Sequence, residues 1–345
     1  MTNKKTEKEN IENAQSGAYA KFKDSLGVEK LESFDFADLF SETFKSRGRR
    51  EVENYYLVGC EITTPKIHDV EDGWPKPWLF VRTFFFMFTA FLILVIAYFE
   101  WANINLIPGI IFIGCFAMPM TVVTFFFEMN SPHNISIPAL GRGVIMGGVF
   151  SLFCALIFFD YTSSLNWMGD PVAGIAEEPA KLVAVLLISR GQHYPYILNG
   201  ILLGAAVGAG FAAFESMGYA LQVLVEGAEN YNFLANISLR GVLSPFAHIA
   251  WTAMIAGAYW RVSAGGPFSL SHITDPRFLK ILIYAVALHM IWNLPIQLPF
   301  FGTYIILGVA SWMVILGLLQ EGYKEIRIIK AQSADTIPTL TPPCR

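Results

Sequence analysis

Two adjacent glutamates, Glu177 and Glu178, lie in an apolar stretch that is long enough to cross a membrane, from residue 171 to residue 189. A charged side chain near the middle of a bilayer costs about 2.5 to 3.5 kcal/mol on insertion scales, so such a pair indicates a functional site. Lys181 follows Glu177 by four residues and shares its helix face, where it can partly neutralise the pair. Two carboxylates in different environments are suited to general acid and base work at neutral pH.

Three further groups that bind protons or metal ions follow in later apolar stretches: Glu215, His248 and His289. Counting about 1.5 Å per residue from the expected outer ends of the spans puts these groups and the pair at a depth of roughly 9 to 14 Å. Four helices are therefore expected to meet in the outer third of the membrane. Thr252 and Asn293 each follow a histidine by four residues, so each can orient an imidazole, a ligand or a water.

The composition places these groups in a membrane protein. The chain has 345 residues, of which 54% are hydrophobic and 15% charged, and residues 1–78 hold 12 of the 24 Lys and Arg and 15 of the 28 Asp and Glu. Runs of about 17 to 25 mostly apolar residues predict an all-α multi-pass membrane protein with about eight transmembrane helices. The runs lie near 80–99, 106–127, 143–160, 171–189, 196–224, 241–260, 279–295 and 301–320.

Lys and Arg in the short loops predict the orientation. The loops near 100–105, 161–170 and 296–300 contain neither residue, whereas the loops on the other side are basic, and only Arg240 goes against this pattern. The N-terminus and the C-terminus are therefore predicted to be cytoplasmic. We expect a polar cytoplasmic arm over 1–78, an eight-helix domain over 79–322 and a short cytoplasmic tail over 323–345.

The arm is expected to have two parts. Residues 1–27 have the composition of a disordered segment. Residues 28–44 place Phe and Leu among acidic residues, which is typical of an amphipathic segment. Such a segment either lies against the membrane or the domain, or docks a partner.

Four short motifs occur in order on consecutive predicted spans. They are Glu177-Glu178-Pro179-Ala180-Lys181, Phe211-x-x-x-Glu215, His248 and His289-x-x-x-Asn293. Together with the stretch from Glu128 to Pro132, they resemble the PrsW family of intramembrane proteases, which is related to the CAAX prenyl protease and bacteriocin-processing superfamily. The resemblance covers roughly residues 80–320. It departs from the family at Asn293, where an aspartate often occurs.

The resemblance implies a bacterial, multi-pass protease of the cell membrane. Its substrate would be a single-span or membrane-anchored protein, an anti-sigma factor in the best known case, cleaved near the outer face of the lipid bilayer. No nucleic-acid partner is expected. The implied catalytic residues are Glu177, Glu178, Glu215, His248 and His289, with Lys181, Thr252 and Asn293 in support.

Peptide hydrolysis at such a site needs an activated water. We expect Glu177 or Glu178 to act as the general base and to return the proton to the leaving amine. Two histidines and a glutamate suit Zn²⁺ with an open fourth position, so Glu215, His248 and His289 are the expected metal ligands. In the metal-free alternative, the histidines donate hydrogen bonds to the oxyanion. No organic cofactor is expected.

A proton-coupled membrane carrier is the alternative from another class, because buried carboxylates and histidines also relay protons. A carrier predicts internal repeats and broken helices in both halves of the chain. The ionisable groups of this cluster are confined to the fourth to seventh predicted spans, and no internal repeat is evident. The sequence also has no Gly-x-Ser-x-Gly, no Gly-x-Gly-Asp within a span and no His-Glu-x-x-His. Their absence argues against the serine, aspartyl and zincin-type membrane proteases.

Overall fold

The computed structural model describes residues 25–27, 34–59, 63–191, 193–226, 230–296 and 298–335. These residues form α-helices joined by short turns, with no β-strand among them, and six stretches are long and apolar enough to cross a membrane. The prediction of an all-helical multi-pass membrane protein is confirmed. The longer helices are α4 (Leu79–Trp101), α5 (Ile107–Met129), α7 (Gly148–Tyr161), α8 (Val172–Ser189), α9 (Ile197–Val225), α10 (Asn230–Leu243), α11 (His248–Ser263), α13 (Pro276–Trp292) and α14 (Gly302–Asp335).

Helices α8 and α13 occupy the fourth and seventh predicted spans but are not among the six. Helix α8 contains Glu177, Glu178 and Lys181, and α13 is only 17 residues long. Both helices are instead covered by other parts of the chain around Glu177, Glu178 and His289, whose side chains are buried. The count of eight and the cytoplasmic placement of the termini stay predictions.

The sixth predicted span begins earlier than expected. We expected a loop up to residue 240, but α10 is helical and leads through Ser244–Phe246 directly into α11, so Asn232–Ser263 forms one candidate span. Pro245 accounts for the break, because proline has no N–H to donate within a helix. Because α10 contains several polar residues, it was not recognised in the sequence as part of an apolar span. The expected helix start at residue 241, from which the depth of His248 was counted, was therefore wrong, and the depth itself stays a prediction.

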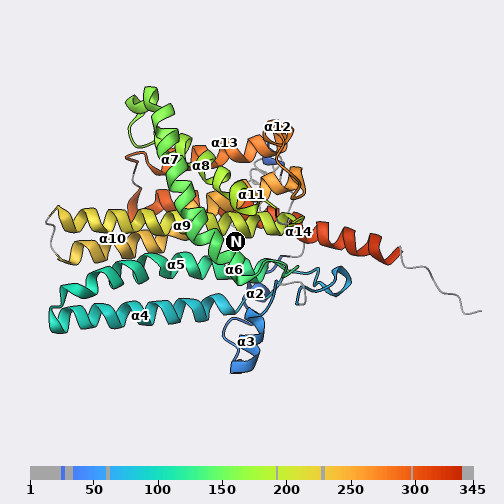
Figure 1. Cartoon of the computed structure of the whole chain (residues 1–345), viewed down its shortest axis with the longest axis horizontal. Helices are drawn as coiled ribbons and strands as arrows, with labels where there is room; N and C mark the ends of the chain where they lie inside the picture. Colours follow the sequence, from blue (N-terminus) through green and yellow to red (C-terminus); the bar gives the residue numbers. More distant parts are fainter. Residues whose placement is uncertain are drawn as a thin grey trace, which may run out of the picture.

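Helix α9 runs through the middle of the molecule, between the α4–α5 pair and the group formed by α7, α8 and α13 (Figure 1). Its glycines bring it into backbone contact with neighbours. A Cβ atom on Gly208 would lie 2.6 Å from the carbonyl oxygen of His248, and one on Gly210 would lie 1.9 Å from that of Val144. The α9–α11 contact therefore sits beside the predicted site. Gly200, Gly204 and Gly208 recur at a spacing of four residues, and a Cβ on each would meet atoms of α11, so these small residues let the two helices pack closely.

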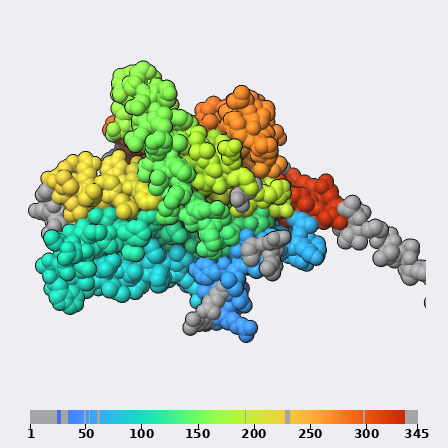
Figure 2. Space-filling view, in the orientation of Figure 1, coloured from blue at the N-terminus to red at the C-terminus, as the bar shows by residue number. Residues whose placement is uncertain are grey.

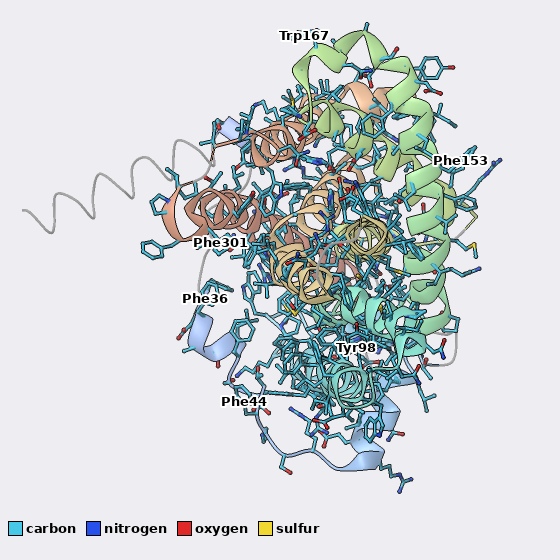
Figure 3. The ribbon with its side chains drawn as sticks, turned by 90° about the vertical axis from the view of Figure 1, so that its left-hand side faces the viewer. Phe36, Phe44, Tyr98, Phe153, Trp167 and Phe301 are labelled. Atoms are coloured by element: carbon cyan, nitrogen blue, oxygen red, sulfur yellow. The ribbon has the colours of Figure 1, made fainter. Side chains whose placement is uncertain are left out.

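The perimeter carries large apolar side chains. The end of α7 and the turn Ser163–Met168 project beyond the neighbouring helices (Figure 2), and Phe153 and Trp167 lie on the outside of this projection (Figure 3). Large apolar side chains exposed in this way are more stable in contact with lipid than with water, because no other part of the chain covers them. The perimeter is thus consistent with a chain surrounded by lipid.

The described part of the N-terminal arm packs against the helical domain. The ring of Phe40 lies 6.1 Å from that of Phe80 and 6.5 Å from that of Phe125, measured between centroids. Where the arm leads into α4, a Glu128 carboxylate accepts hydrogen bonds at 2.7 to 2.9 Å from three backbone N–H groups, those of residues 78–80. Lys330 of α14 also donates to the carbonyl oxygen of Val70 at 2.8 Å. Residues 34–44 therefore lie against the domain, while most of 1–27, and 28–33, fall outside the described residues.

Gly210 offers a test of the central packing. We expect Gly210→Ala to lower the free energy of unfolding by about 1 to 3 kcal/mol, because the new methyl group would collide with the Val144 carbonyl. Gly218→Ala is the matched control in the same helix. Nothing lies within 4 Å of its added Cβ, so it should be neutral or stabilise by up to about 1 kcal/mol. Thermal unfolding of both variants in detergent is the measurement, and equal stability would contradict the close approach.

Candidate active site

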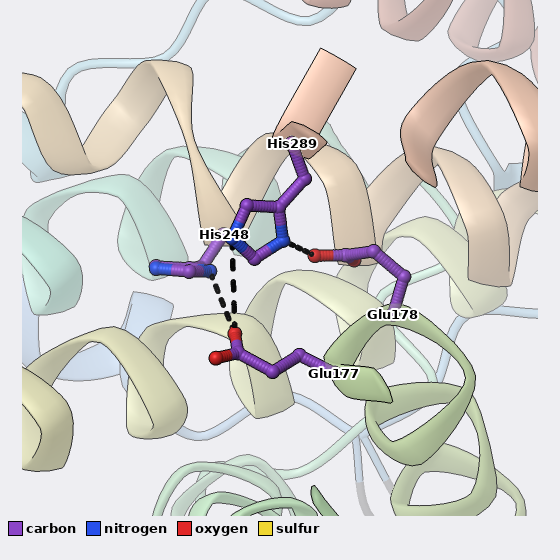
Figure 4. A group of neighbouring side chains, drawn as sticks. All are labelled: Glu177, Glu178, His248 and His289. Carbon is purple, nitrogen blue, oxygen red and sulfur yellow. Dashed lines mark hydrogen bonds and ion pairs between the residues drawn. The ribbon is translucent and has the colours of Figure 1, made fainter. Parts of the chain in front are cut away.

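The two glutamates of α8 point into the protein and not toward lipid. The side chain of Glu178 is fully buried and that of Glu177 is 8% exposed. They precede Pro179, which cannot donate to the carbonyl of Ile175 and so loosens this turn of the helix. Figure 4 shows the Glu177 carboxylate directed at both imidazole rings. The adjacent glutamates are therefore interior groups of one polar cluster.

Lys181 is the cation at the centre of this cluster. Its Nζ atom lies 2.7 Å from Oε1 of Glu178, 3.4 Å from Oε2 of Glu177 and 2.8 Å from Nδ1 of His248. The side chain is completely buried, and the ammonium stands 4.2 Å from the centre of the Phe211 ring. The expectation that Lys181 neutralises the pair agrees with this geometry, although its shorter contact is with Glu178 and not with Glu177.

His289 is fixed on two sides. Its Nδ1 atom lies 2.7 Å from Oε1 of Glu178, which orients the ring and leaves Nε2 facing Oε2 of Glu177 at 3.9 Å. The ring of Trp251 stacks on the imidazole, with centroids 4.5 Å apart and planes inclined by 24°. In metal sites, a histidine commonly hydrogen-bonds a carboxylate through one ring nitrogen and binds the ion through the other, and His289 has this arrangement of its first nitrogen.

His248 begins α11, immediately after the break, and is held by Glu215 of α9. Its Nε2 atom lies 3.0 Å from Oε2 of Glu215, and Nδ1 lies 3.9 Å from Oε2 of Glu177. Glu215 is also paired with Arg240 of α10, whose Nε donates to the hydroxyl of Ser216 at 2.9 Å. The five predicted catalytic residues therefore lie in one connected network contributed by α8, α9, α11 and α13.

Thr252 and Asn293, each expected to orient an imidazole, a ligand or a water, donate hydrogen bonds to backbone carbonyls in this structure. The hydroxyl of Thr252 donates to the backbone carbonyl of His248 at 2.7 Å, so it supports the first turn of α11 and does not reach a ring. The amide of Asn293 donates to the carbonyl of Asp170 at 3.2 Å and ties the end of α13 to the start of α8. A spacing of four residues places each side chain on the same helix face as its histidine. It does not show that a backbone carbonyl oxygen is the nearer hydrogen-bond acceptor.

Three contributors to the site were not singled out from the sequence as functional. Phe211 entered only as part of a motif and was given no role, yet it contacts both Lys181 and the His248 ring, whose centroid is 5.0 Å away. Trp251 follows His248 by three residues, a spacing that places both on one side of α11. Arg240 was noticed only as an exception to the charge pattern of the loops, and that exception is explained by its pairing with Glu215.

Four of the residues have the donor atoms and spacing for a metal ion. One ligand atom each from Glu177, Glu178, His248 and His289 lies within 4.8 Å of the others. Within the described part of the chain, Oε2 of Glu177 and Oε2 of Glu178 are buried without a hydrogen-bond partner. Carboxylates with imidazoles suit zinc and related divalent ions. Glu215, which we expected in the ligand set, is not in this group. The Lys181 ammonium lies close to Nδ1 of His248, so an ion bound at that nitrogen would displace the ammonium.

An all-helical multi-pass fold with buried carboxylates, imidazoles and a candidate metal group defines a membrane-embedded enzyme centre. The family model for the PrsW family intramembrane metalloprotease matches residues 76–319, and the chain belongs to this family. It is therefore an intramembrane protease, which supports the peptidase interpretation over the carrier. Searches of curated proteins and of solved structures found no match.

Lys181 supplies a test of the charge balance. We expect Lys181→Gln to lower the free energy of unfolding by about 3 to 5 kcal/mol, because removing one partner leaves buried carboxylates unpaired. The matched control is Lys76→Gln, which breaks an exposed pair of similar length, 2.8 Å to Asp38, and should change the stability far less, because solvent screens exposed pairs. The measurement is thermal or denaturant unfolding in detergent. Similar losses for the two variants would show that Lys181 does not stabilise the cluster.

Proposed function

We propose that this protease hydrolyses a peptide bond of a single-span or membrane-anchored protein, near the outer face of a bacterial cell membrane. The substrate would be of the anti-sigma-factor kind that the family resemblance implies. The observation that carries the proposal is the position of Oε2 of Glu177. This oxygen is buried, accepts no hydrogen bond from the described residues and faces a nitrogen of each histidine at 3.9 Å.

In this proposal Glu177 is the general base. A water beside Oε2 gives one proton to the carboxylate, and its oxygen bonds to the carbonyl carbon of the substrate. When the carbon–nitrogen bond breaks, Glu177 returns the proton to the leaving amine, so that one product has a new carboxyl group and the other a new amino group. Proton transfer of this kind accelerates reactions by about 10² to 10⁴-fold.

The neighbouring residues keep the reacting groups in position. Glu178 is occupied by the Lys181 ammonium and by His289, both at 2.7 Å, and so serves better as a holder of these groups than as the base. Glu215 holds the His248 ring from the opposite nitrogen at 3.0 Å. Nε2 of His289 is thereby left available to donate to a developing oxyanion or to bind an ion. Nδ1 of His248 also faces Glu177, but it lies 2.8 Å from the Lys181 ammonium, which an ion bound there would displace.

The donor set fits a divalent metal ion, for which Zn²⁺ is our candidate. His248, His289 and a carboxylate of the Glu177–Glu178 pair would hold it, in place of the set containing Glu215 that was predicted from the sequence. When bound, such an ion would acidify a water and polarise the substrate carbonyl. With Glu178 as the carboxylate ligand, Glu177 would remain free to move the proton, and the Lys181 ammonium would give up its contact with Nδ1 of His248.

Substitution of the base is the direct test. Glu177→Gln should reduce cleavage by at least about 10²-fold while the protein stays folded in the membrane, because glutamine cannot accept the proton. Glu226→Gln, an exposed position at the end of α9, is the control and should retain activity. New protein N-termini in the membrane fraction, read by mass spectrometry, report cleavage. Full activity of both Glu177→Gln and Glu178→Gln would remove the pair from the mechanism.

Metal content tests the ligand set. We expect purified protein to bind zinc, and His289→Ala to lose it, whereas Glu215→Gln should keep most of it. Elemental analysis after dialysis gives the stoichiometry. As a second readout, zinc at 100 times its dissociation constant should raise the free energy of unfolding by about 2.7 kcal/mol. Loss of zinc in Glu215→Gln would instead support the ligand set predicted from the sequence.

A further inference from the structure

A small cavity is lined in part by His248, while Lys181 and its carboxylate partners are not among its lining residues. Its volume is about 240 Å³, and its walls come from α9, α10, α11, α13 and α14. Five small or polar residues, Ala212, Ser216, Asn236, Ser244 and Ala247, form much of the lining. The volume is below the range of about 300 to 1,000 Å³ that is typical of small-molecule sites, and it suits one small side chain with its backbone.

The exposure of the charged side chains increases toward this cavity. Those of Lys181 and Glu178 are 0% exposed and that of Glu177 is 8% exposed, whereas the values for His248 and Arg240, which line the cavity, are 12% and 27%. The cluster is therefore closed on the α8 side and accessible on the α10 side. A substrate approaching from α10 would meet His248 before it met Glu177.

A second, larger hollow continues the first toward the surface. Its volume is about 640 Å³, and it shares Leu239 and Tyr304 with the inner cavity. The rest of its lining is residues 298–301, which lead into α14, and Thr303 in the first turn of that helix. Phe300 and Phe301 are 92% and 55% exposed. The two hollows together lead from the surface to His248.

The inner cavity offers backbone-binding chemistry. A transmembrane substrate must unwind to present its scissile carbonyl, and each N–H and C=O group it frees in a membrane needs a new partner. The side-chain oxygen of Asn236 is buried and accepts no hydrogen bond from the described residues, so it can accept one from a substrate N–H. Arg240 is already paired with Glu215, so the wall has no unbalanced positive charge to attract an acidic side chain.

We propose that the two hollows form one substrate channel, an inference that rests on the proposed peptidase function. The inner cavity binds a small uncharged residue next to the cleaved bond, in a segment held extended by Asn236. The outer hollow binds a large apolar residue of the same segment against Phe300, Phe301 and Leu239. The substrate class is thus a membrane-anchored polypeptide that carries a small residue at the cut and an apolar residue a few positions away.

Leu239 is the position at which to test the channel, because it lines both hollows while its side chain is 44% exposed. Leu239→Trp should fill the junction without disturbing the core. Val242→Trp is the matched control on the same helix, since Val242 is 62% exposed and lines neither hollow. New N-termini are compared in membranes of cells that express the wild type, Glu177→Gln, Leu239→Trp or Val242→Trp.

We expect Leu239→Trp to reduce the yield of wild-type N-termini by about tenfold or more, equivalent to about 1.4 kcal/mol of lost transition-state binding, and Val242→Trp to change it less than about twofold. Gly, Ala or Ser should flank the cut on one side. Equal yields from Leu239→Trp and the wild type, or bulky or charged residues on both sides of the cut, would overturn the channel. Absence of any difference between the wild type and Glu177→Gln would instead overturn the proposed peptidase function.

A photo-crosslinking residue distinguishes a peptide from a lipid chain in the outer hollow. Benzoylphenylalanine is placed at position 239 or at position 242 in the Glu177→Gln protein, in native membranes. Position 239 should crosslink to a protein that the wild type cleaves, and position 242 should not. Crosslinks from position 239 to lipid alone would assign the hollow to an acyl chain and contradict the proposal.

Discussion

The buried ammonium of Lys181 is the interaction on which the site depends. It touches Glu178, Glu177 and His248 within 3.4 Å, and it is shielded from solvent by the ring of Phe211. Two carboxylates without this cation would carry the desolvation cost of adjacent like charges in a low-dielectric interior. With it, α8 can place both glutamates inside the bundle. The helix is too charged to be lipid-facing along this side, and its partners α7, α9 and α13 cover it.

The second requirement is close contact between α9 and α11. Gly208 lets the α9 backbone approach the carbonyl of His248, and this approach brings Glu215, two turns further along α9, within 3.0 Å of the His248 ring. The break at Pro245 then makes His248 the first residue of its helix. Packing and chemistry are coupled here, because a bulkier residue at position 208 would move the histidine away from its glutamate.

The sequence was sufficient for the class of fold and for the residues of the cluster, because buried charge in apolar runs is expensive and therefore conspicuous. It was insufficient for α10, whose asparagines and arginine lower its apolar character, and for the contacts of Thr252 and Asn293. Periodicity gives the face of a helix but not the distance to atoms of another helix. The roles of Trp251 and Arg240 depend on such distances. So does the finding that Glu177, and not Glu215, lies 3.9 Å from a nitrogen of each imidazole.

Charge bookkeeping across the cluster connects its stability with its chemistry. With both imidazoles neutral, the three carboxylates of Glu177, Glu178 and Glu215 exceed the two cations, Lys181 and Arg240, by one negative charge. Glu178 and Glu215 each have a cation within direct contact, so the excess resides on Glu177, whose nearest cation is 3.4 Å away. Acceptance of a proton from water by Glu177 would leave the cluster balanced. The carboxylate whose charge is least compensated is thus the one placed between the two imidazoles, where the proposed mechanism requires its base.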